Sequence, residues 1–435
     1  MNHPTNSRLE WAVGCLVTVA LVTACLLACL CSAGGIAWQA AMWPLPTPTV
    51  TSQPLDDETT SRHLRVFTRL WNIVNDDYLY PDYNGADWEA IGRQYRARVA
   101  AGMSDQDFWW TMDDMLLELH DDHSIFLSPA QATSEDQELN GEFEYVGIGV
   151  YAVPLPEKEY VVVLLTLPNS PAARAGIRPH DHILSIDGTP TCCDKHGYNN
   201  LDLLLGPAGS KAELRVQAVD GPVRTVSVTR ELVLESLPVE TRRLEGNVGY
   251  ILIPTLWDET TVEHVQQALD ELSAGGDLDG LVLDMRVNGG GSDIVLKGLL
   301  ALFADGELGH FVSGQEERPL RVDGVDVHGS QRIPLVILVG RETASFAEIF
   351  SGVLQEAGRA QIVGRTTPGN VEITYGYDFE DGSRAWIAQE SFRPPSGTDW
   401  EQTGIVPEVE IPLGWDEFTT EDDPQLETAL DLLRP

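Results

Sequence analysis

One serine lies where a buried strand gives way to a helix, a position that suits a nucleophile. PLVILVG is an apolar run typical of a buried strand, and SFAEIFSGVL, after a short turn, has apolar residues at helical spacing. Ser345 opens that helix, where free backbone N–H groups and the helix dipole favour negative charge developing on an oxygen. Taken alone, the segment is more typical of a helix in which Ser345 or Thr343 is only the N-cap.

A glycine-rich loop could supply backbone donors to the same chemistry. In LVLDMRVNGGGSD, three successive glycines follow a buried strand and precede a helix. Glycines let backbone amides approach a ligand closely, as an oxyanion hole requires. The loop lacks the Lys-Ser/Thr pair of a Walker phosphate loop. Considered by itself, the motif favours a tight turn over an oxyanion hole.

Two histidines in ELHDDHSIFLSP, His120 and His123, are candidates for a general base. Histidine suits that role because its proton is exchanged near neutral pH. Their His-x-x-His spacing also occurs in metal sites, but no third ligand lies nearby in the sequence. A histidine next to acidic residues is more often a surface residue than a base, so this motif needs support from the rest of the chain.

The composition limits which partners and which bases are available. The chain has 435 residues, a net charge of −39 and 43% hydrophobic residues. That apolar content can bury a core, which excludes an acidic disordered chain, and the length suggests about three domains. The negative charge argues against nucleic acid and anionic lipid as partners. Lysines are scarce, and the sequence contains only Lys158, Lys195, Lys211 and Lys297.

The N-terminal segment predicts a membrane anchor. Residues 11–43 include no charged side chain and exceed the roughly 20 residues that span a bilayer as a helix. Arg8 precedes this run and acidic residues follow it. We therefore expect a cytoplasmic tail over residues 1–10, a single transmembrane helix over 11–43, and the remainder outside the cell membrane. A cleaved signal peptide and a lipoprotein anchored at Cys25 are the alternatives.

The patterning divides the rest of the chain into four parts. Residues 44–61 are rich in Pro and Thr and predict an extended linker. Residues 62–136 show apolar residues at helical spacing, and residues 137–235 show short strands with turns. Residues 236–435 alternate strands with helices, which predicts an α/β core with a largely parallel sheet. No disulfide is expected, because the only cysteines after residue 31 are adjacent in sequence.

Several motifs, taken in their order along the chain, resemble those of one known protein family. From about Leu64 to Ile411, the chain resembles the C-terminal processing (tail-specific) serine peptidases and the related tricorn protease core. The matching segments are LWNIVNDDYLYPDYNGADW, LHDDHSIFLSP, GIGV, LPNSPAARAGIRPHDHILSIDG, LLGPAGSKAELRV, GYILI, LDMRVNGGG, TASFAEIFSGVLQEAGRAQIVGRTTPGN, DGSRAWIA and GIVPEVEI. The resemblance implies a crotonase/ClpP-like α/β core with an inserted PDZ-like β domain and a helical N-terminal subdomain, behind the transmembrane helix.

The resemblance also assigns roles to individual residues. The nucleophile corresponds to Ser345 in the TAS-x-x-E element, and the oxyanion donors correspond to the amides of Gly290 and Phe346. A PDZ domain binds a peptide C-terminus with the amides of one loop while the peptide adds a strand to the sheet. That loop corresponds to GIGV, which is Gly147, Ile148, Gly149 and Val150.

The general base departs from the usual pattern of this family. Relatives with a Ser/Lys dyad carry the base in a T-x-G-K element, where this chain has TTPGN and Asn370. An amide cannot take and return a proton near neutral pH. In the tricorn-like branch a histidine activates the serine and a glutamate orients the histidine. His123 and Glu401 of WEQTGIVPE occupy similar positions, so we expect a Ser345–His123–Glu401 triad.

Together these assignments predict a membrane-anchored serine endopeptidase. It would cleave exported or membrane proteins and peptides with accessible C-termini, through an acyl-enzyme. No cofactor or metal is implied, nucleic acid is not expected as a partner, and a homo-oligomer is left open. Two other interpretations remain. One is a catalytically inactive relative that binds peptide C-termini through its PDZ-like domain, and the other is a different hydrolase activity.

Overall fold

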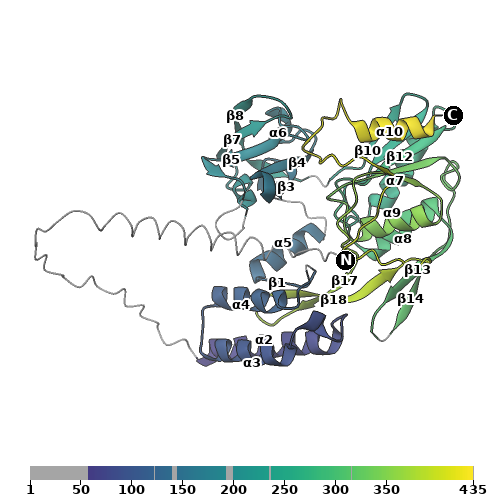
Figure 1. The fold of residues 1–435 in the computed structure, drawn as a ribbon. Helices are drawn as coiled ribbons and strands as arrows, with labels where there is room; N and C mark the ends of the chain where they lie inside the picture. Colours follow the sequence, from purple (N-terminus) through teal and green to yellow (C-terminus); the bar gives the residue numbers. More distant parts are fainter. Residues whose placement is uncertain are drawn as a thin grey trace, which may run out of the picture. The chain divides into compact units, whose positions relative to one another are not determined.

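The computed structural model describes six stretches of the chain (Figure 1), which are residues 57–121, 123–139, 145–192, 199–234, 237–314 and 316–434. Leu55–Pro435 forms one compact unit. In these stretches no helix is both long and apolar enough to cross a membrane. The predicted tail (1–10), the predicted transmembrane helix (11–43) and the first part of the predicted linker lie outside the described residues and stay predictions.

A layer of helices begins the described chain. Its elements are α2 Asp57–Asp77, the 3-10 helix η1 Tyr83–Gly85, α3 Trp88–Ala100, α4 Asp105–Leu117, β1 Ile125–Leu127 and α5 Pro129–Leu139. α2 corrects the sequence prediction, because it starts at Asp57 inside the segment expected to be linker up to residue 61. Acidic Glu58 in its first turn suits the positive end of the helix dipole. The predicted helical part is confirmed.

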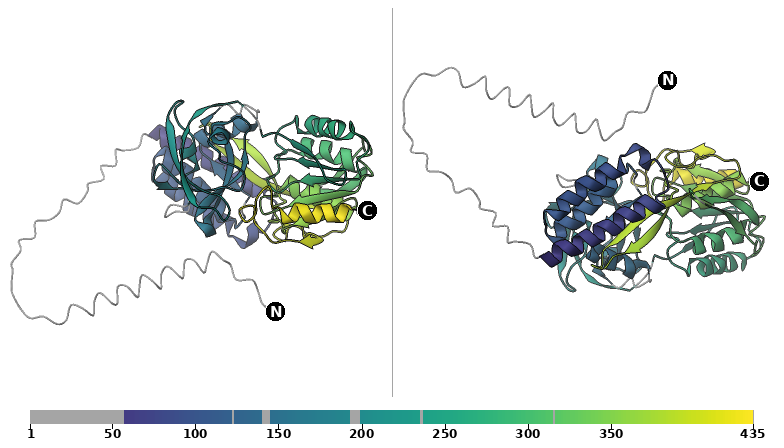
Figure 2. Two further views of the ribbon diagram at one scale, coloured as in Figure 1. Left: turned by 90° about the horizontal axis from the view of Figure 1, so that it is seen from above. Right: turned by 90° about the horizontal axis from the view of Figure 1, so that it is seen from below.

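A long hairpin from the C-terminal half completes the core of this helical layer. Phe379, Ala385, Ile387 and Ala388 pack in one cluster with the buried faces of α2, α3 and α4. Figure 2 (right) shows the hairpin running beside the helices. Its sheet has the order β1-β18-β13-β14, with β17 also on β18. The strands beyond β1 are β13 Gly306–Val312, β14 Glu317–Val322, β17 Ile373–Asp378 and β18 Arg384–Arg393.

The middle of the chain forms a separate set of short strands. A sheet of order β3-β4-β5-β7-β8, with β6 on β5, lies beside the pair β2–β9. The elements are β2 Tyr145–Gly147, β3 Val150–Leu155, the 3-10 helix η2 Pro156–Lys158, β4 Tyr160–Thr166, α6 Pro171–Arg174, β5 His182–Ile186, β6 Thr189–Pro190, the 3-10 helix η3 Leu201–Leu204, β7 Lys211–Gln217, β8 Val223–Thr229 and β9 Glu231–Val233. The predicted β part is confirmed. The expectation of no disulfide is wrong, because Cys192 is disulfide-bonded.

A mostly parallel sheet forms the C-terminal core, in the order β10-β11-β12-β15-β16-β19. The strands are β10 Glu240–Leu244, β11 Val248–Leu252, β12 Gly280–Asp284, β15 Leu335–Val339, β16 Gln361–Gly364 and β19 Val409–Glu410. Neighbours from β11 to β19 are parallel, and β10 is antiparallel to β11. Every residue of β11, β12 and β15 is buried, as parallel strands covered on both faces require. The predicted α/β core is confirmed.

The two faces of this sheet are covered differently. Helices α7 Thr261–Ser273, α8 Asp293–Phe303 and α9 Phe346–Glu356 pack on one face (Figure 1). Helix α10 Pro424–Leu433 and side chains of β3 and β4 pack on the other. Loops at the carboxyl ends of β12 and β15 therefore lie together at one edge of the sheet, where ligands of α/β folds bind. These loops contain the glycine motif and Ser345.

Candidate active site

Ser345 lies on a strained turn between β15 and α9. Its φ of 56° and ψ of −129° put it in a region that residues with a side chain rarely occupy. Its N–H donates to the Asn370 carbonyl at 2.8 Å and to Glu348 Oε2 at 3.1 Å. Such strain persists only where the surroundings fix it, and it concentrates at functional sites. Thr343, the other candidate cap, instead donates its hydroxyl to the Met285 carbonyl at 2.8 Å.

A buried glutamate holds this turn against the next segment of the chain. Glu348 is fully buried on the first turn of α9. Its carboxylate accepts from Thr367 Oγ1 at 2.5 Å, Gly369 N–H at 2.8 Å and Asn370 N–H at 2.8 Å, besides Ser345 N–H. Burial raises the pKa of Glu348, and these hydrogen bonds oppose that rise without cancelling it. The contacts fix residues 367–370 next to the nucleophile.

The glycine loop packs directly on Ser345. A Cβ on Gly290 would lie 2.7 Å from Ser345 Cβ and 3.2 Å from the Phe346 nitrogen, and the φ of Gly290 is +100°. Only glycine fits this position. Of the two predicted oxyanion donors, the Phe346 N–H has no hydrogen-bond partner in the described part of the chain. The Gly290 N–H already donates to Asn288 Oδ1 at 2.9 Å, and the Asn288 amide donates in turn to the Ile253 carbonyl.

The predicted base and its orienting carboxylate lie together. His123 Nε2 is 3.0 Å from Glu401 Oε1, and Glu401 Oε2 accepts the Val371 N–H at 3.0 Å. Asp121 shapes the histidine turn, because its Oδ1 accepts the N–H groups of His123 at 2.9 Å and Ser124 at 2.6 Å. Nδ1 of His123 has no hydrogen-bond partner among the described residues. That nitrogen is therefore available to accept a proton.

A second carboxylate, Glu372, faces the same histidine nitrogen. Its Oε2 lies 3.8 Å from His123 Nε2, and its side chain is only 2% exposed. Oε1 accepts a hydrogen bond from the Tyr80 hydroxyl, whereas Oε2 is buried and has no hydrogen-bond partner in the described stretches. Burial raises the pKa of Glu372 to about 7, against the lowering effect of His123. No motif in the sequence pointed to Glu372.

The surrounding charges set the proton affinity of His123. Burial alone would lower its pKa, because it disfavours the charged ring. The hydrogen bond to Glu401 and the negative charges of Glu372, Glu401 and Asp121 outweigh burial, so the pKa of His123 is raised from its ordinary value of 6.5. The neutral ring, which can accept a proton, is therefore favoured only at pH values above this raised pKa.

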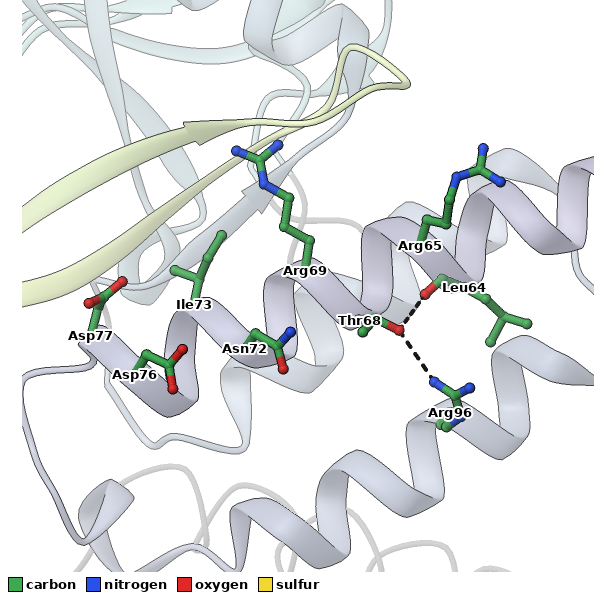
Figure 3. A pocket seen from close by; sticks show the side chains of 9 residues that line it. All are labelled: Leu64, Arg65, Thr68, Arg69, Asn72, Ile73, Asp76, Asp77 and Arg96. Carbon is green, nitrogen blue, oxygen red and sulfur yellow. Dashed lines mark hydrogen bonds between the residues drawn. The ribbon is translucent and has the colours of Figure 1, made fainter.

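These groups border a cavity of about 260 Å³. It is lined by Tyr80, Asn84, His120, Asp121, His123, Pro368, Gly369, Asn370, Glu372, Glu401 and Gln402. A larger hollow of about 530 Å³ lies along α2 and is lined by polar, charged and aliphatic side chains of that helix and by Arg96 of α3 (Figure 3). That hollow contains none of the predicted catalytic residues, whereas the smaller cavity is lined by His123 and Glu401, though not by Ser345.

The structure brings the predicted residues together in two groups. Ser345 lies with Gly290 and Phe346, and His123 lies with Glu401. No hydrogen bond joins Ser345 to His123 among the described residues. The two groups are linked through the main chain that follows Gly369, since Ser345 N–H donates to the carbonyl of Asn370, and the next N–H binds Glu401.

The three lysines that the structure describes do not replace the missing base. Lys158 is bonded to Asp416, and Lys297 donates to Asp293 at 2.9 Å one turn earlier on α8. Lys211 lies exposed at the start of β7, and Lys195 is outside the described residues. Asn370 is held by Glu348 through its own N–H. The contacts of the lysines therefore leave His123 as the candidate base.

The predicted peptide-binding loop lies where β2 leads into β3. Ile148 is buried, its carbonyl accepts the Ala172 N–H at 2.9 Å, and the Gly149 carbonyl accepts the Leu167 N–H at 3.1 Å. Gly149 has a φ of +78°, and a Cβ there would lie 2.4 Å from Ser170 Cβ. Gly147 ends β2 and Val150 begins β3. The loop carbonyls are thus used internally.

Sequence profiles of known domains match three parts of the chain. Peptidase family S41 matches residues 247–411, the Tricorn protease C1 domain matches residues 63–117, and a PDZ domain matches residues 162–218. These ranges fall in the parallel core, the helical layer and the middle strands.

Two relatives align with most of the chain. The chain is 30% identical over 386 residues to a carboxyl-terminal-processing protease of Picosynechococcus sp., covering 84% of this chain and 88% of the relative. It is 29% identical over 383 residues to a chloroplastic C-terminal processing peptidase of Tetradesmus obliquus, covering 84% and 79%.

Solved structures extend the likeness to the fold. A photosystem II D1 C-terminal processing protease is similar at a TM-score of 0.62 and 29% identity, over 86% of this chain and 97% of that one. The tricorn protease has the same fold at a TM-score of 0.51 and 20% identity, over 86% of this chain and 37% of that one.

Proposed function

The chain belongs to the carboxyl-terminal-processing family of serine peptidases, and on this premise we propose that it cleaves peptide bonds through an acyl-enzyme on Ser345 with His123 as the base. One observation carries the choice of base. Glu401 binds His123 Nε2 at 3.0 Å and is itself fixed by a main-chain N–H at 3.0 Å, while the family's lysine position holds Asn370. A histidine oriented by a fixed carboxylate is the arrangement that a serine nucleophile needs.

The proposed chemistry follows from the different roles of the two imidazole nitrogens. With its proton on Nε2 bonded to Glu401, the ring presents the Nδ1 lone pair to the Ser345 hydroxyl. Nδ1 takes the serine proton as Oγ attacks the scissile carbonyl, and then returns a proton to the leaving amine. Glu401 holds the tautomer and stabilises the imidazolium.

The oxyanion would be held at the start of α9. The Phe346 N–H points from the helix N-terminus, where the dipole also favours negative charge. The Gly290 N–H joins it once it leaves Asn288 Oδ1, its partner at 2.9 Å in this structure. The reaction also requires Ser345 and His123 to come within hydrogen-bond reach, so we expect the residue 369–371 segment between them to shift when substrate binds.

The substrates we propose are exported or membrane proteins with accessible C-termini. The GIGV loop of the PDZ domain would hold the terminal carboxylate, with the tail adding to the sheet edge. The apolar run over residues 11–43 would anchor the enzyme in the cell membrane, with the peptidase outside it.

The experiment compares single variants in a peptidase assay on a peptide with a free C-terminus. Ser345→Ala and His123→Ala should each lower kcat/KM by at least about a thousandfold, since a triad acts as a unit. Asn370→Ala should keep most of the activity, because its amide is not a base. Activity that survives in His123→Ala and is lost in Lys297→Ala would contradict the triad.

One observation keeps a second candidate function in view. Ser345 and His123 are not hydrogen-bonded in this structure. A catalytically inactive relative that only binds peptides would also lack this hydrogen bond. Such a protein would bind C-terminal peptides with the same affinity before and after Ser345→Ala, and would show no turnover in either form.

A further inference from the structure

Three side chains of the catalytic cavity converge on one point. One ligand atom from each of His123, Glu372 and Glu401 lies within 4.8 Å of the others. Nε2 of His123 is 3.0 Å from Glu401 Oε1 and 3.8 Å from Glu372 Oε2. A tetrahedral metal ion with bonds of about 2.0–2.2 Å separates its ligand atoms by roughly 3.4 Å. The two measured separations bracket that value.

Glu372 provides a separate indication of a ligand. Its side chain is 2% exposed, and Oε2 is buried without a hydrogen-bond partner among the described residues, while it faces His123. A buried carboxylate oxygen in this state is costly unless a cation or donor satisfies it. The triad chemistry makes no use of this oxygen.

The outer contacts of these ligands suit a metal site. The Tyr80 hydroxyl binds Glu372 Oε1, and a main-chain N–H binds Glu401 Oε2 at 3.0 Å, so each carboxylate is oriented through its other oxygen. Hydrogen-bonded carboxylates of this kind are typical of metal sites. The adjoining cavity of about 260 Å³ leaves room for water as a fourth ligand.

We propose that His123, Glu372 and Glu401 form a binding site for a divalent cation of the Zn²⁺ class, and that the bound ion blocks the peptidase. One nitrogen and two carboxylate oxygens are donors that Zn²⁺ accepts, whereas Mg²⁺ and Ca²⁺ prefer oxygen alone. The ligands differ from the His120/His123 pair suggested by the sequence, because His120 is not in the cluster.

Inhibition follows from the proton on the ring. Zn²⁺ takes the Nε2 lone pair and displaces the proton shared with Glu401. A neutral imidazole with a metal on Nε2 carries its proton on Nδ1, so it has no lone pair left to accept the Ser345 proton. This consequence rests on the proposed triad, whereas the binding of Zn²⁺ does not.

The binding test uses the full chain with Ser345→Ala and isothermal titration of ZnCl₂, in millimolar Mg²⁺ that fills weak carboxylate sites. We expect one Zn²⁺ per chain. Adding Glu372→Gln or Glu401→Gln should weaken binding at least tenfold, with folding checked by thermal melting. Glu317→Gln, at an exposed position of strand β14, removes the same charge and should leave the affinity within threefold.

Two results would overturn the site. One is a Zn²⁺ affinity that neither Glu372→Gln nor Glu401→Gln changes. The other is an equal loss of Zn²⁺ affinity in Glu317→Gln, which would show that only the net charge of the chain matters. In the active wild type, Zn²⁺ should inhibit turnover over the same concentrations at which it binds, and chelation should restore it. Zn²⁺ binding without inhibition would contradict the proposal that the bound ion blocks the peptidase. Full activity in His123→Ala would contradict the proposed triad but would not affect the binding result.

Discussion

His123 lies between two carboxylates of different kinds, and this decides when it can act as a base. Glu401 is hydrogen-bonded at 3.0 Å and fixed by the main chain. Glu372 is a charge neighbour at 3.8 Å with an oxygen that nothing else satisfies. Both stabilise the protonated ring, and together with Asp121 they outweigh burial, so the pKa of His123 rises above 6.5.

A pH profile tests this environment. Because only the neutral ring accepts a proton, kcat/KM should increase with pH, and the midpoint of the increase should lie above 6.5. Glu372→Gln removes one negative neighbour, so the pKa of His123 should fall and the ascending limb should move to lower pH. A limb that stays in place in Glu372→Gln would show that this carboxylate does not act on the base.

The residues of the candidate site were easier to propose from the sequence than their contacts were. Ser345, His123 and Glu401 stand in motifs of recognisable order, and the scarcity of lysine directed attention to histidine. Glu372 follows TTPGN without a motif of its own, and its proximity to His123 is a product of the fold. The bond from Gly290 N–H to Asn288 could not be predicted either, because a glycine run does not say where its amides point.

At the level of elements, residues 367–371 connect the two halves of the site. Glu348 on α9 accepts from Thr367, Gly369 and Asn370, and the following N–H binds Glu401. One short segment thus contacts both the nucleophile turn and the orienting carboxylate. A shift in this segment changes both halves together.

Replacing Glu348 by Ala should therefore disturb catalysis and stability. Four donors would lose their buried acceptor, which should cost roughly 3 kcal/mol of unfolding free energy. Misplacement of the nucleophile should lower kcat at least about tenfold with a smaller effect on KM. Steady-state kinetics and chemical unfolding measure both effects.

Glu356→Ala is the matched control, since Glu356 lies on the same helix and, among the described residues, accepts hydrogen bonds only from exposed Ser396. It should cost less than about 1 kcal/mol, as surface changes usually do. Equal losses in the two variants would show that Glu348 has no special role in positioning Ser345.

The elements themselves were largely predictable, because their patterns are strong. Continuous apolar runs marked β11, β12 and β15, and 3.6-residue spacing marked α7, α8 and α9. The predicted start of α2 was wrong. Pro and Thr before the helix suggested a linker up to residue 61, whereas the helix begins at Asp57 and Glu58. The hairpin β17–β18 joins the helical layer through contacts distant in sequence, which local patterns do not reveal.

At the scale of the whole molecule, one buried acid, Asp416, contributes to the attachment of the PDZ part to the core. Asp416 is 5% exposed, and its carboxylate binds Lys158 and, at 2.6 Å, the Tyr160 hydroxyl. His182 Nε2 binds the Asp416 carbonyl at 3.0 Å. Burial favours a raised pKa for Asp416, but Lys158 and Tyr160 outweigh it and hold the pKa below its ordinary value.

Asp416→Ala should loosen this attachment. Unfolding free energy should fall by about 1–3 kcal/mol, and the amides of β3 and β4 should exchange hydrogen faster. Because the folded pKa is lowered, the carboxylate stabilises above the unfolded value of about 3.9. The difference from wild type should therefore shrink as pH falls through the folded pKa. Glu417→Ala, which removes an exposed partner of Lys158, should leave exchange in these strands unchanged.

The order of parts along the chain was visible in the change of periodicity, from helical spacing to short strands to alternating strands and helices. How the parts share a core was not visible. Leu155 and Leu164 of the PDZ strands pack with Tyr250 and Val282 of the parallel sheet. From the sequence pattern alone, each pair would be assigned to the core of its own domain.

Activation of Ser345 by His123 is tested most directly by labelling the full chain with a serine-reactive fluorophosphonate. It reports whether Ser345 is an activated nucleophile and which group activates it, without knowledge of the substrate. If His123 activates Ser345, we expect labelling of the wild type and of Asn370→Ala, none in Ser345→Ala, and a rate at least about a hundredfold lower in His123→Ala. Labelling of His123→Ala at the wild-type rate, or of Ser345→Ala at any comparable rate, would contradict it.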